Sequence, residues 1–238
     1  MIPIALKKWL GIRHSCKSPN SIFIGLIGGV GDLISAAPSV AALKRKYPDA
    51  KINFGVGDGI FFNTIKNDPN IDHFETPFFY DVWKKRARRK TYREKYKEHD
   101  LVFLLDNGTQ DWWQPRKHLL DIYAEKCGVS LEERRPLIYL NDSDFEEAQK
   151  KIYELGISDK NKFLVLSPET RSKKKMKEWP YERFLLLIQK IRENHDFKII
   201  TLVSKDNPYN YDGTILLKGY PLGPSAAMIS RANFYLGL

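Results

Sequence analysis

The chain has 238 residues, of which 42% are hydrophobic and 13% aromatic, so it can build one large or two modest packed domains and is not a wholly disordered chain. Its formal net charge of +10 favours an anionic partner, such as nucleic acid, anionic lipid or a phosphorylated sugar, without choosing among them. The two cysteines, Cys16 and Cys127, form neither a disulfide framework nor a zinc-site spacing, which favours a reducing, cytoplasmic setting.

Residues 1–20 are predicted to be an N-terminal extension. Lys7 and Lys8 interrupt its apolar part, so it is not interpreted as a signal peptide, and no apolar run in the sequence is long enough to span a bilayer. A surface helix packed on its own domain is the favoured interpretation, and an amphipathic helix lying on a membrane is the alternative. The apolar residues available for membrane contact are Ile4, Leu6, Trp9 and Leu10.

Apolar runs alternate with helical patterns through the first half of the chain. The expected strands are residues 21–27, 51–57, 71–74 and 101–105, with a further strand-like run, RRPLIYL, at 134–140. The expected helices are a segment that starts near Leu33 and residues 60–66, 81–98, 117–127 and 144–155. Pro38 lies within the first helical pattern, so it either begins that helix or bends it.

The polar stretch GISDKNK is a plausible domain boundary, after which the alternation restarts. Strands are expected at residues 163–166, 197–203, 214–217 and 233–238, and helices at 181–193 and 224–231. Repeated strand–helix alternation predicts an α/β fold with parallel sheets covered on both faces. The predicted domains are residues 21–160 and 161–238, and the second has fewer predicted strands than a doubly wound sheet normally has.

A glycine-rich loop, IGGVGDL, follows the first expected strand. Its glycines Gly28, Gly29 and Gly31 do not have the G-x-G-x-x-G spacing, which disfavours a nucleotide-dependent oxidoreductase, and no Gly-Lys-Ser/Thr follows to make a P-loop. Asp32 has two interpretations. Spacing alone favours a helix cap, and the alternative is a carboxylate that accepts a proton from a substrate hydroxyl.

A second informative stretch, LSPETRSKKKMKEWPYERF, joins an expected strand to an expected helix. Hydroxyl groups and cations precede a helix that Pro180 is expected to begin, which is the combination that binds phosphate. A solvated basic loop is an equally weighted alternative. The candidate phosphate-binding residues are Ser167, Thr170, Arg171 and Lys177, with further lysines at 173–175.

The densest basic segment begins at Lys84 and ends at Lys97. A charge run of this kind is usually a solvated helix face. Tyr92 and Tyr96 within it are compatible with nucleic-acid binding, or they form a buried stripe, and contact with an anionic membrane fits equally well.

The spacing Asp142-x-Asp144 is one that some sugar-nucleotide enzymes use to hold a divalent metal. Ser143 and Glu146 also form a capping-box pattern just before a helical segment, and capping is strongly favoured. The histidines have no metal-site spacing, so no metal site is expected.

Together these motifs resemble glycosyltransferase family 9, the ADP-heptose–lipopolysaccharide heptosyltransferases. The resemblance lies in GGVGDLISAAPSVAALKRKYPDAKINFGVGD, NIDHF, HDLVFLLDNG, HLLDIYAEKCGV, FLVLSPET, KEWPYERF and AAMISRANFYLGL, which follow in the family's order. It implies a GT-B fold with an N-terminal acceptor-binding domain and a C-terminal domain for an ADP-sugar, the second incomplete. It also implies an inverting transfer that needs no metal or other cofactor.

The resemblance assigns roles to particular residues. Asp32 matches the general base, Lys177 the lysine at the donor pyrophosphate, and Thr170 a hydroxyl beside it. Gly28, Gly29 and Gly31 are expected to form the acceptor-side loop, whose turn brings Asp32 round to face an acceptor hydroxyl. Heptose is the family's common donor sugar. The implied partners are a nucleotide-sugar donor and a lipid-linked or lipopolysaccharide-type saccharide acceptor at the cytoplasmic face of the membrane. The basic segment would then contact anionic lipid, and nucleic acid is not an expected partner.

The family continues with an Asp-Ser/Thr-Gly-x-x-His segment after the point where this sequence ends, at Leu238. The sequence is therefore expected to be a fragment or truncated reading frame with little activity of its own. The alternative function is a non-catalytic module that binds anionic glycans or nucleic acid through the basic segment and through Lys173 to Lys177.

Overall fold

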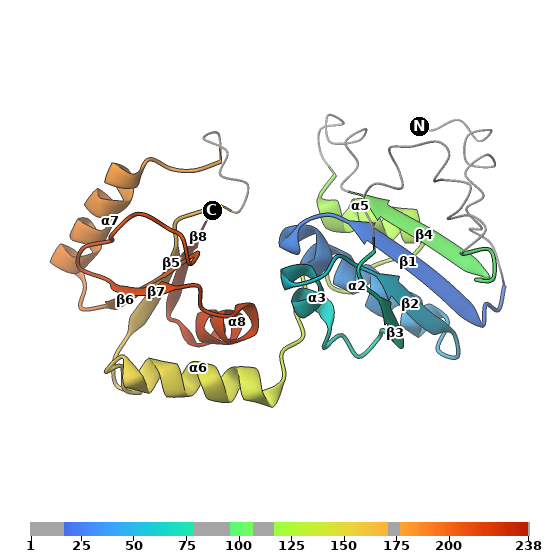
Figure 1. Cartoon of the computed structure of the whole chain (residues 1–238), viewed down its shortest axis with the longest axis horizontal. Helices are drawn as coiled ribbons and strands as arrows, with labels where there is room; N and C mark the ends of the chain where they lie inside the picture. The colour runs from blue at the N-terminus through green and yellow to red at the C-terminus, as the bar shows by residue number, and fades with distance from the viewer. Residues whose placement is uncertain (1–16, 79–95, 107–116, 171–176, 238) are drawn as a thin grey trace. The chain divides into compact units, whose positions relative to one another are not determined.

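The computed structural model describes residues 17–78, 96–106, 117–170 and 177–237. The chain divides into two compact units, Met1–Tyr139 and Leu140–Leu238, and each is an α/β unit built on a parallel sheet (Figure 1). The predicted fold class is confirmed. In the described part, no helix combines the length and the apolar character needed to cross a bilayer.

The first unit is built around one central strand, β1, which pairs with β2 on one side and with β4 on the other. The strand order is β3-β2-β1-β4 and every pairing is parallel. The strands are β1 (Ser21–Ile27), β2 (Lys51–Gly55), β3 (His73–Glu75) and β4 (Leu101–Asp106). The helices are α2 (Val30–Lys46), α3 (Ile60–Ile65) and α5 (Leu119–Cys127).

Side chains on both faces of β1 are buried, as expected for a central strand of a parallel sheet. Ile22 and Ile24 belong to the large core that includes Leu33 and Val40 of α2. Phe23 belongs to a smaller aromatic cluster, where its ring stacks on that of Tyr96 with centroids 3.8 Å apart. Tyr96 is therefore part of the buried stripe. Tyr92 and most of the expected helix 81–98 lie outside the described residues.

Helix α2 continues through Pro38 without ending there. A proline has no N–H, so the carbonyl of Ile34, four residues earlier, loses its usual helical donor. The backbone N–H of Leu137 donates to that carbonyl instead, at 2.9 Å. Leu137 belongs to the RRPLIYL run, which was expected to be a strand but has no strand pairing in the structure. The run therefore contacts helix α2 through Leu137 and is not a strand, so its apolar residues were a misleading sign of one.

The second unit repeats the strand order of the first, as β7-β6-β5-β8, again all parallel. The strands are β5 (Phe163–Ser167), β6 (Lys198–Val203), β7 (Ile215–Lys218) and β8 (Phe234–Gly237). The helices are α6 (Asp142–Glu154), α7 (Tyr181–Asn194) and α8 (Leu222–Arg231). Pro180, expected as the first residue of α7, is its N-cap.

The division between the units falls after Tyr139, whereas the sequence suggested residue 160. The reason is the packing of α6, which precedes the polar GISDKNK stretch but lies against α8. Ala148 and Ile152 of α6 share one buried cluster with Ala227 and Met228 of α8. The helix therefore completes the core of the second unit.

The start of α6 also differs from the expected capping box of Ser143 and Glu146. Asn141 is the N-cap, and its side-chain oxygen accepts from the N–H of Asp144 at 2.9 Å. The Asp144 carboxylate accepts from the N–H of Asn141 at 3.1 Å in return. The structure therefore shows Asp144 as a capping residue of α6.

Candidate functional site

The glycine loop that contains Asp32 and the basic loop that contains Lys177 follow equivalent strands of their two sheets. In the first unit, β2 and β3 lie on one side of β1 and β4 lies on the other; in the second, β6 and β7 lie on one side of β5 and β8 on the other. The strand order therefore reverses at β1 and at β5. Ligands of open parallel sheets bind outside the carboxyl ends of the strands at such a reversal. The glycine loop leaves the carboxyl end of β1, and the basic loop leaves that of β5.

Asp32 lies in the first turn of α2, and both of its carboxylate oxygens have protein donors. Oδ2 accepts from the backbone N–H of Gly29 at 2.5 Å, and Oδ1 accepts from the hydroxyl of Tyr123 at 3.1 Å. The side chain thus caps its own helix, as the spacing suggested. It is only half-buried, and each carboxylate oxygen has more than one lone pair, so it can still accept a hydrogen bond from a ligand.

Of the three glycines expected beside Asp32, only Gly28 is required by close packing. A Cβ at Gly28 would lie 2.5 Å from Cβ and Cγ of Asp32. A Cβ at Gly29 would meet Asp32 Oδ2 at an ordinary 3.5 Å, and one at Gly31 would meet nothing within 4 Å. Gly28 therefore allows the carboxylate to fold back over the end of β1.

The second group of predicted residues lies at the carboxyl edge of the second sheet. Ser167 is the last residue of β5, Thr170 follows it in the loop, and Lys177 is exposed just before α7. Arg171 and the lysines at 173–175 lie outside the described residues. The structure thus places Ser167, Thr170 and Lys177 in one connection between β5 and the N-terminus of α7, a helix end that attracts anions.

Two carboxylates in this connection were not singled out from the sequence. Glu178 accepts from Thr170 Oγ1 at 3.3 Å. Glu169 accepts from Asn207 Nδ2 at 2.6 Å and from the backbone N–H of Ser204, which ties the loop after β5 to the loop after β6. Nothing in the local spacing indicates these partners, because Asn207 and Ser204 are distant in sequence.

Tyr123 was also missed as a site residue. Its segment, HLLDIYAEKCGV, contributed to an expected helix and to the family resemblance, and an isolated tyrosine in an apolar helical pattern usually indicates core. Tyr123 is indeed fully buried, in the core cluster with Leu33 and Cys127, yet its hydroxyl reaches Asp32. Burial raises the pKa of the neighbouring Cys127 thiol to about 12, so that thiol stays protonated and chemically inert.

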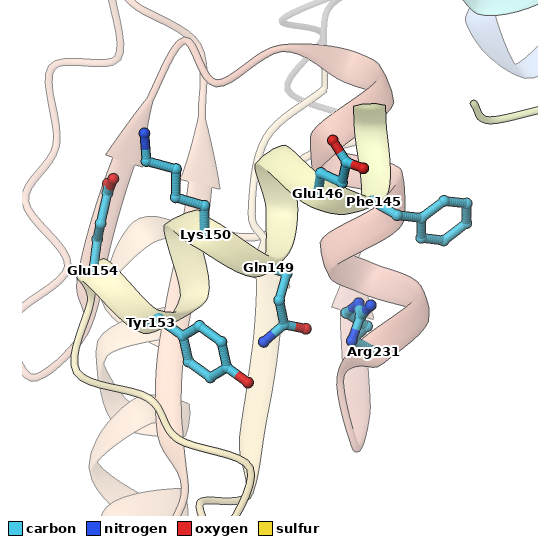
Figure 2. Close-up of a pocket in the computed structure, with 7 residues that line it drawn as sticks. All are labelled: Phe145, Glu146, Gln149, Lys150, Tyr153, Glu154 and Arg231. Atoms are coloured by element: carbon cyan, nitrogen blue, oxygen red, sulfur yellow. The ribbon is translucent and has the colours of Figure 1, made fainter. Parts of the chain in front are cut away.

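A shallow groove of about 610 Å³ lies along α6 of the second unit, and none of the predicted site residues lines it. Figure 2 shows Gln149 and Tyr153 extending from α6 beside Arg231 of α8. Arg231 is the last residue of α8, and Tyr153 is near the end of α6, shortly before the chain enters β5. This end of the groove is therefore near the amino edge of the sheet, whereas Ser167 lies at the carboxyl edge.

The basic segment from Lys84 to Lys97 lies outside the described residues, except for Tyr96 and Lys97. Tyr96 is buried, and its hydroxyl donates to Glu75 at 2.8 Å. Among the described residues, no three histidine, cysteine, aspartate or glutamate side chains gather as metal ligands.

No protein-family profile and no curated protein matches the sequence. Solved structures with the same fold do match. The glycosyl transferase family 9 protein from Veillonella parvula is 19% identical, with 92% of this chain and 75% of that chain covered at a TM-score of 0.66. ADP-heptose LPS heptosyltransferase II of E. coli is 12% identical, with 90% and 78% covered at 0.60. E. coli heptosyltransferase WaaC with ADP is 16% identical, with 90% and 80% covered at 0.57.

These likenesses are at the level of the fold, because the sequence identities are low. They agree with the expected pair of Rossmann-like units and with the family resemblance noted in the motifs.

Proposed function

We propose that the chain is an inverting glycosyltransferase that moves a sugar from an ADP-sugar to a hydroxyl of a lipid-linked or lipopolysaccharide-type saccharide. One observation carries the proposal. In a fold shared with heptosyltransferases, a half-buried carboxylate and a set of hydroxyl and ammonium groups each follow the strand at which their sheet reverses. The opposite charges of the two groups suit a proton acceptor and a phosphate site.

Asp32 is the general base of the proposed reaction. As the acceptor oxygen attacks the anomeric carbon of the donor, its proton passes to the Asp32 carboxylate. The bond between the anomeric carbon and the ADP phosphate oxygen breaks in the same displacement, so the configuration at that carbon inverts. The carboxylate is already fixed by Gly29 and Tyr123, and it needs no further reorganisation to accept the proton.

The second unit binds the donor. Negative charge grows on the leaving ADP as the glycosidic bond breaks, and cations with a helix N-terminus stabilise it. Lys177 and the start of α7 supply that stabilisation, with Ser167 and Thr170 as hydroxyl donors to the diphosphate. Arg171 completes the proposed set. No metal takes part in the proposed step.

Heptose is the first donor sugar to test, since two E. coli neighbours are heptosyltransferases, one solved with ADP and with an ADP-heptose analogue. We place the reaction at the cytoplasmic face of the membrane, where a lipid-linked acceptor presents its sugar. The net charge of +10 favours such an anionic surface.

The test compares Asp32→Asn with Asp144→Asn in the full chain. Both aspartates occupy the third position of a helix and accept from the N-cap N–H, so the second variant controls for lost capping. Transfer from ADP-heptose to deacylated, heptose-deficient lipopolysaccharide is followed by mass spectrometry, and ADP binding by calorimetry. We expect Asp32→Asn to lose roughly 100- to 10,000-fold in turnover while ADP binding survives, and Asp144→Asn to keep its turnover.

Retained turnover in Asp32→Asn would refute the assignment of the base. A wild-type chain that binds neither ADP nor ADP-heptose would refute the proposed function as a whole. Steeply salt-dependent binding to oligonucleotides by that same chain would favour a non-catalytic binding module.

A further inference from the structure

We propose that Tyr123 is a positioning residue that holds the Asp32 carboxylate in the orientation needed to accept a proton. The inference rests on the proposed function of Asp32 and concerns a residue outside the glycine loop. Its basis is the 3.1 Å hydrogen bond from the Tyr123 hydroxyl to Asp32 Oδ1, made between two helices of the first unit, α5 and α2.

The Tyr123 ring is held firmly. The residue is 0% exposed and is one of the largest fully buried side chains of the unit. It lies in the core formed by α2, α5 and the sheet, where α5 packs directly beside α2. A ring packed on all sides has little freedom to turn, so its hydroxyl group has a nearly fixed position. A polar group at such a depth also needs a hydrogen-bond partner, and Asp32 provides one.

The Tyr123 hydroxyl restrains a rotation of the Asp32 carboxylate that the hydrogen bond from Gly29 still allows. The N–H of Gly29 contacts Oδ2 alone, and one hydrogen bond to one oxygen allows the carboxylate to rotate about it. The Tyr123 hydroxyl holds the other oxygen, so the plane of the carboxylate is set by two contacts from different elements. Hydrogen bonds to a charged acceptor are stronger than those between neutral groups, which makes the pair an effective restraint.

The geometry of the loop supports the same conclusion. The carboxylate lies so close to Gly28 that a methyl group there would overlap it, so it cannot retreat in that direction. Asp32 is thus bounded by Gly28, Gly29 and Tyr123, and it is left half-exposed on its remaining side. We infer that this open side is the one that meets the acceptor hydroxyl.

The experiment compares Tyr123→Phe with Tyr96→Phe in the full chain. Both tyrosines are buried in the first unit and both donate to a carboxylate, Asp32 or Glu75, so each variant loses a similar hydrogen bond. Only Tyr123→Phe is expected to lower kcat for ADP-heptose and deacylated lipopolysaccharide, by roughly 10- to 100-fold, with the KM for ADP-heptose unchanged. A merely structural role would lower the activity of both variants alike.

A second measurement does not depend on catalysis. In Tyr123→Phe the Asp32 carboxylate is free to rotate, so hydrogen exchange at the Gly29 amide, followed by NMR, should become roughly three- to tenfold faster. In Tyr96→Phe it should be unchanged. Equal kcat values in the two variants, or an unaltered Gly29 amide in Tyr123→Phe, would overturn the proposal. If the wild-type chain binds neither ADP nor ADP-heptose, the proposed function fails, and the Gly29 amide still decides whether Tyr123 fixes the carboxylate.

Discussion

Oε1 of Glu178 lies 3.3 Å from Oγ1 of Thr170 and 3.4 Å from the Thr170 backbone nitrogen. Thr170 was expected to donate to a donor phosphate, but here it has a carboxylate partner in its own loop. Glu178 also follows Lys177 directly in sequence. A nucleotide diphosphate that reaches this loop must therefore compete with Glu178 for the hydroxyl and approach a negative charge.

Removing that charge should tighten ADP binding. Glu178→Gln keeps an oxygen that can accept from Thr170 but removes the repulsion between carboxylate and diphosphate. Two like charges about 4 Å apart in water repel by about 1 kcal/mol, so we expect the Kd for ADP to fall roughly fivefold in low salt. Calorimetry measures the change. Glu193→Gln, near the far end of α7, is the control that should leave the Kd unaltered. An unchanged Kd in Glu178→Gln would argue against phosphate binding in this loop.

The glycines beside Asp32 should respond unequally to alanine. Gly28→Ala places a methyl group 2.5 Å from the Asp32 side chain, so the carboxylate must move and sugar transfer should fall at least tenfold. Gly31→Ala meets nothing within 4 Å and lies in a helix, where alanine is favoured by up to about 1 kcal/mol. Urea unfolding should show Gly31→Ala to be at least as stable as the wild type, with unaltered turnover. Equal losses in both variants would contradict this account of the loop.

The partner of the Ile34 carbonyl should change if Pro38 is replaced. Pro38→Ala restores an N–H that can donate to Ile34 and so competes with Leu137. Hydrogen exchange at the Leu137 amide should then become roughly three- to tenfold faster, because one hydrogen bond contributes about 1 kcal/mol. Pro48→Ala, in the exposed turn after α2, should leave that amide unaffected. Exchange at Leu137 that is the same in all three proteins would show that its protection comes from elsewhere.

The stability of the first unit should fall as the pH drops below about 6.5. Burial lowers the pKa of His99 from its ordinary 6.5, against the opposite influence of Glu98, Asp100 and Glu75. The unfolded chain therefore binds the proton more readily than the folded one. The stability due to neutral His99 is complete above 6.5 and is lost progressively below that value. The distance from His99 Nδ1 to the hydroxyl oxygen of Ser21 is 2.5 Å. Protonation of His99 therefore changes a contact at the start of β1.

Urea unfolding at several pH values from 7.5 to 5 checks the effect of His99. His99→Asn cannot gain this charge, so its free energy of unfolding should decline less over the range than that of the wild type. His73→Asn, at an exposed position on β3, should keep the wild-type profile. A His99→Asn profile parallel to that of the wild type would assign the decline to other groups.

Much of the fold could be predicted from local patterns. Strand β1 was expected at its observed bounds, and β4 and β5 differ from expectation by one residue at the end. These three strands are continuous apolar runs bounded by polar or glycine residues, which is the pattern typical of strands in a buried parallel sheet. The RRPLIYL run and the place of α6 were not predictable in this way. Their neighbours, Ile34 for the run and Met228 for the helix, come from distant parts of the chain.

The residues of the candidate site also differ in whether a local sequence pattern indicates them. Asp32 and Lys177 could be singled out because each follows a strand and precedes or begins a helix, which is a local signal. Tyr123 and Glu169 could not, because their roles depend on the partners Asp32 and Asn207, which the fold brings to them. A buried tyrosine and a glutamate in a basic loop have no distinctive spacing of their own.

The hydrogen bond between Leu137 and Ile34 also bears on the order in which the protein can fold. As the chain leaves the ribosome, helix α2 emerges early with one carbonyl that its own sequence cannot satisfy, because Pro38 offers no N–H. That carbonyl gains its protein donor only after β4 and α5 have been synthesised. The Ile34 carbonyl thus gains this donor only when the last residues of the first unit are available, and a nascent chain that ends before Leu137 should have a less protected α2 than a longer one.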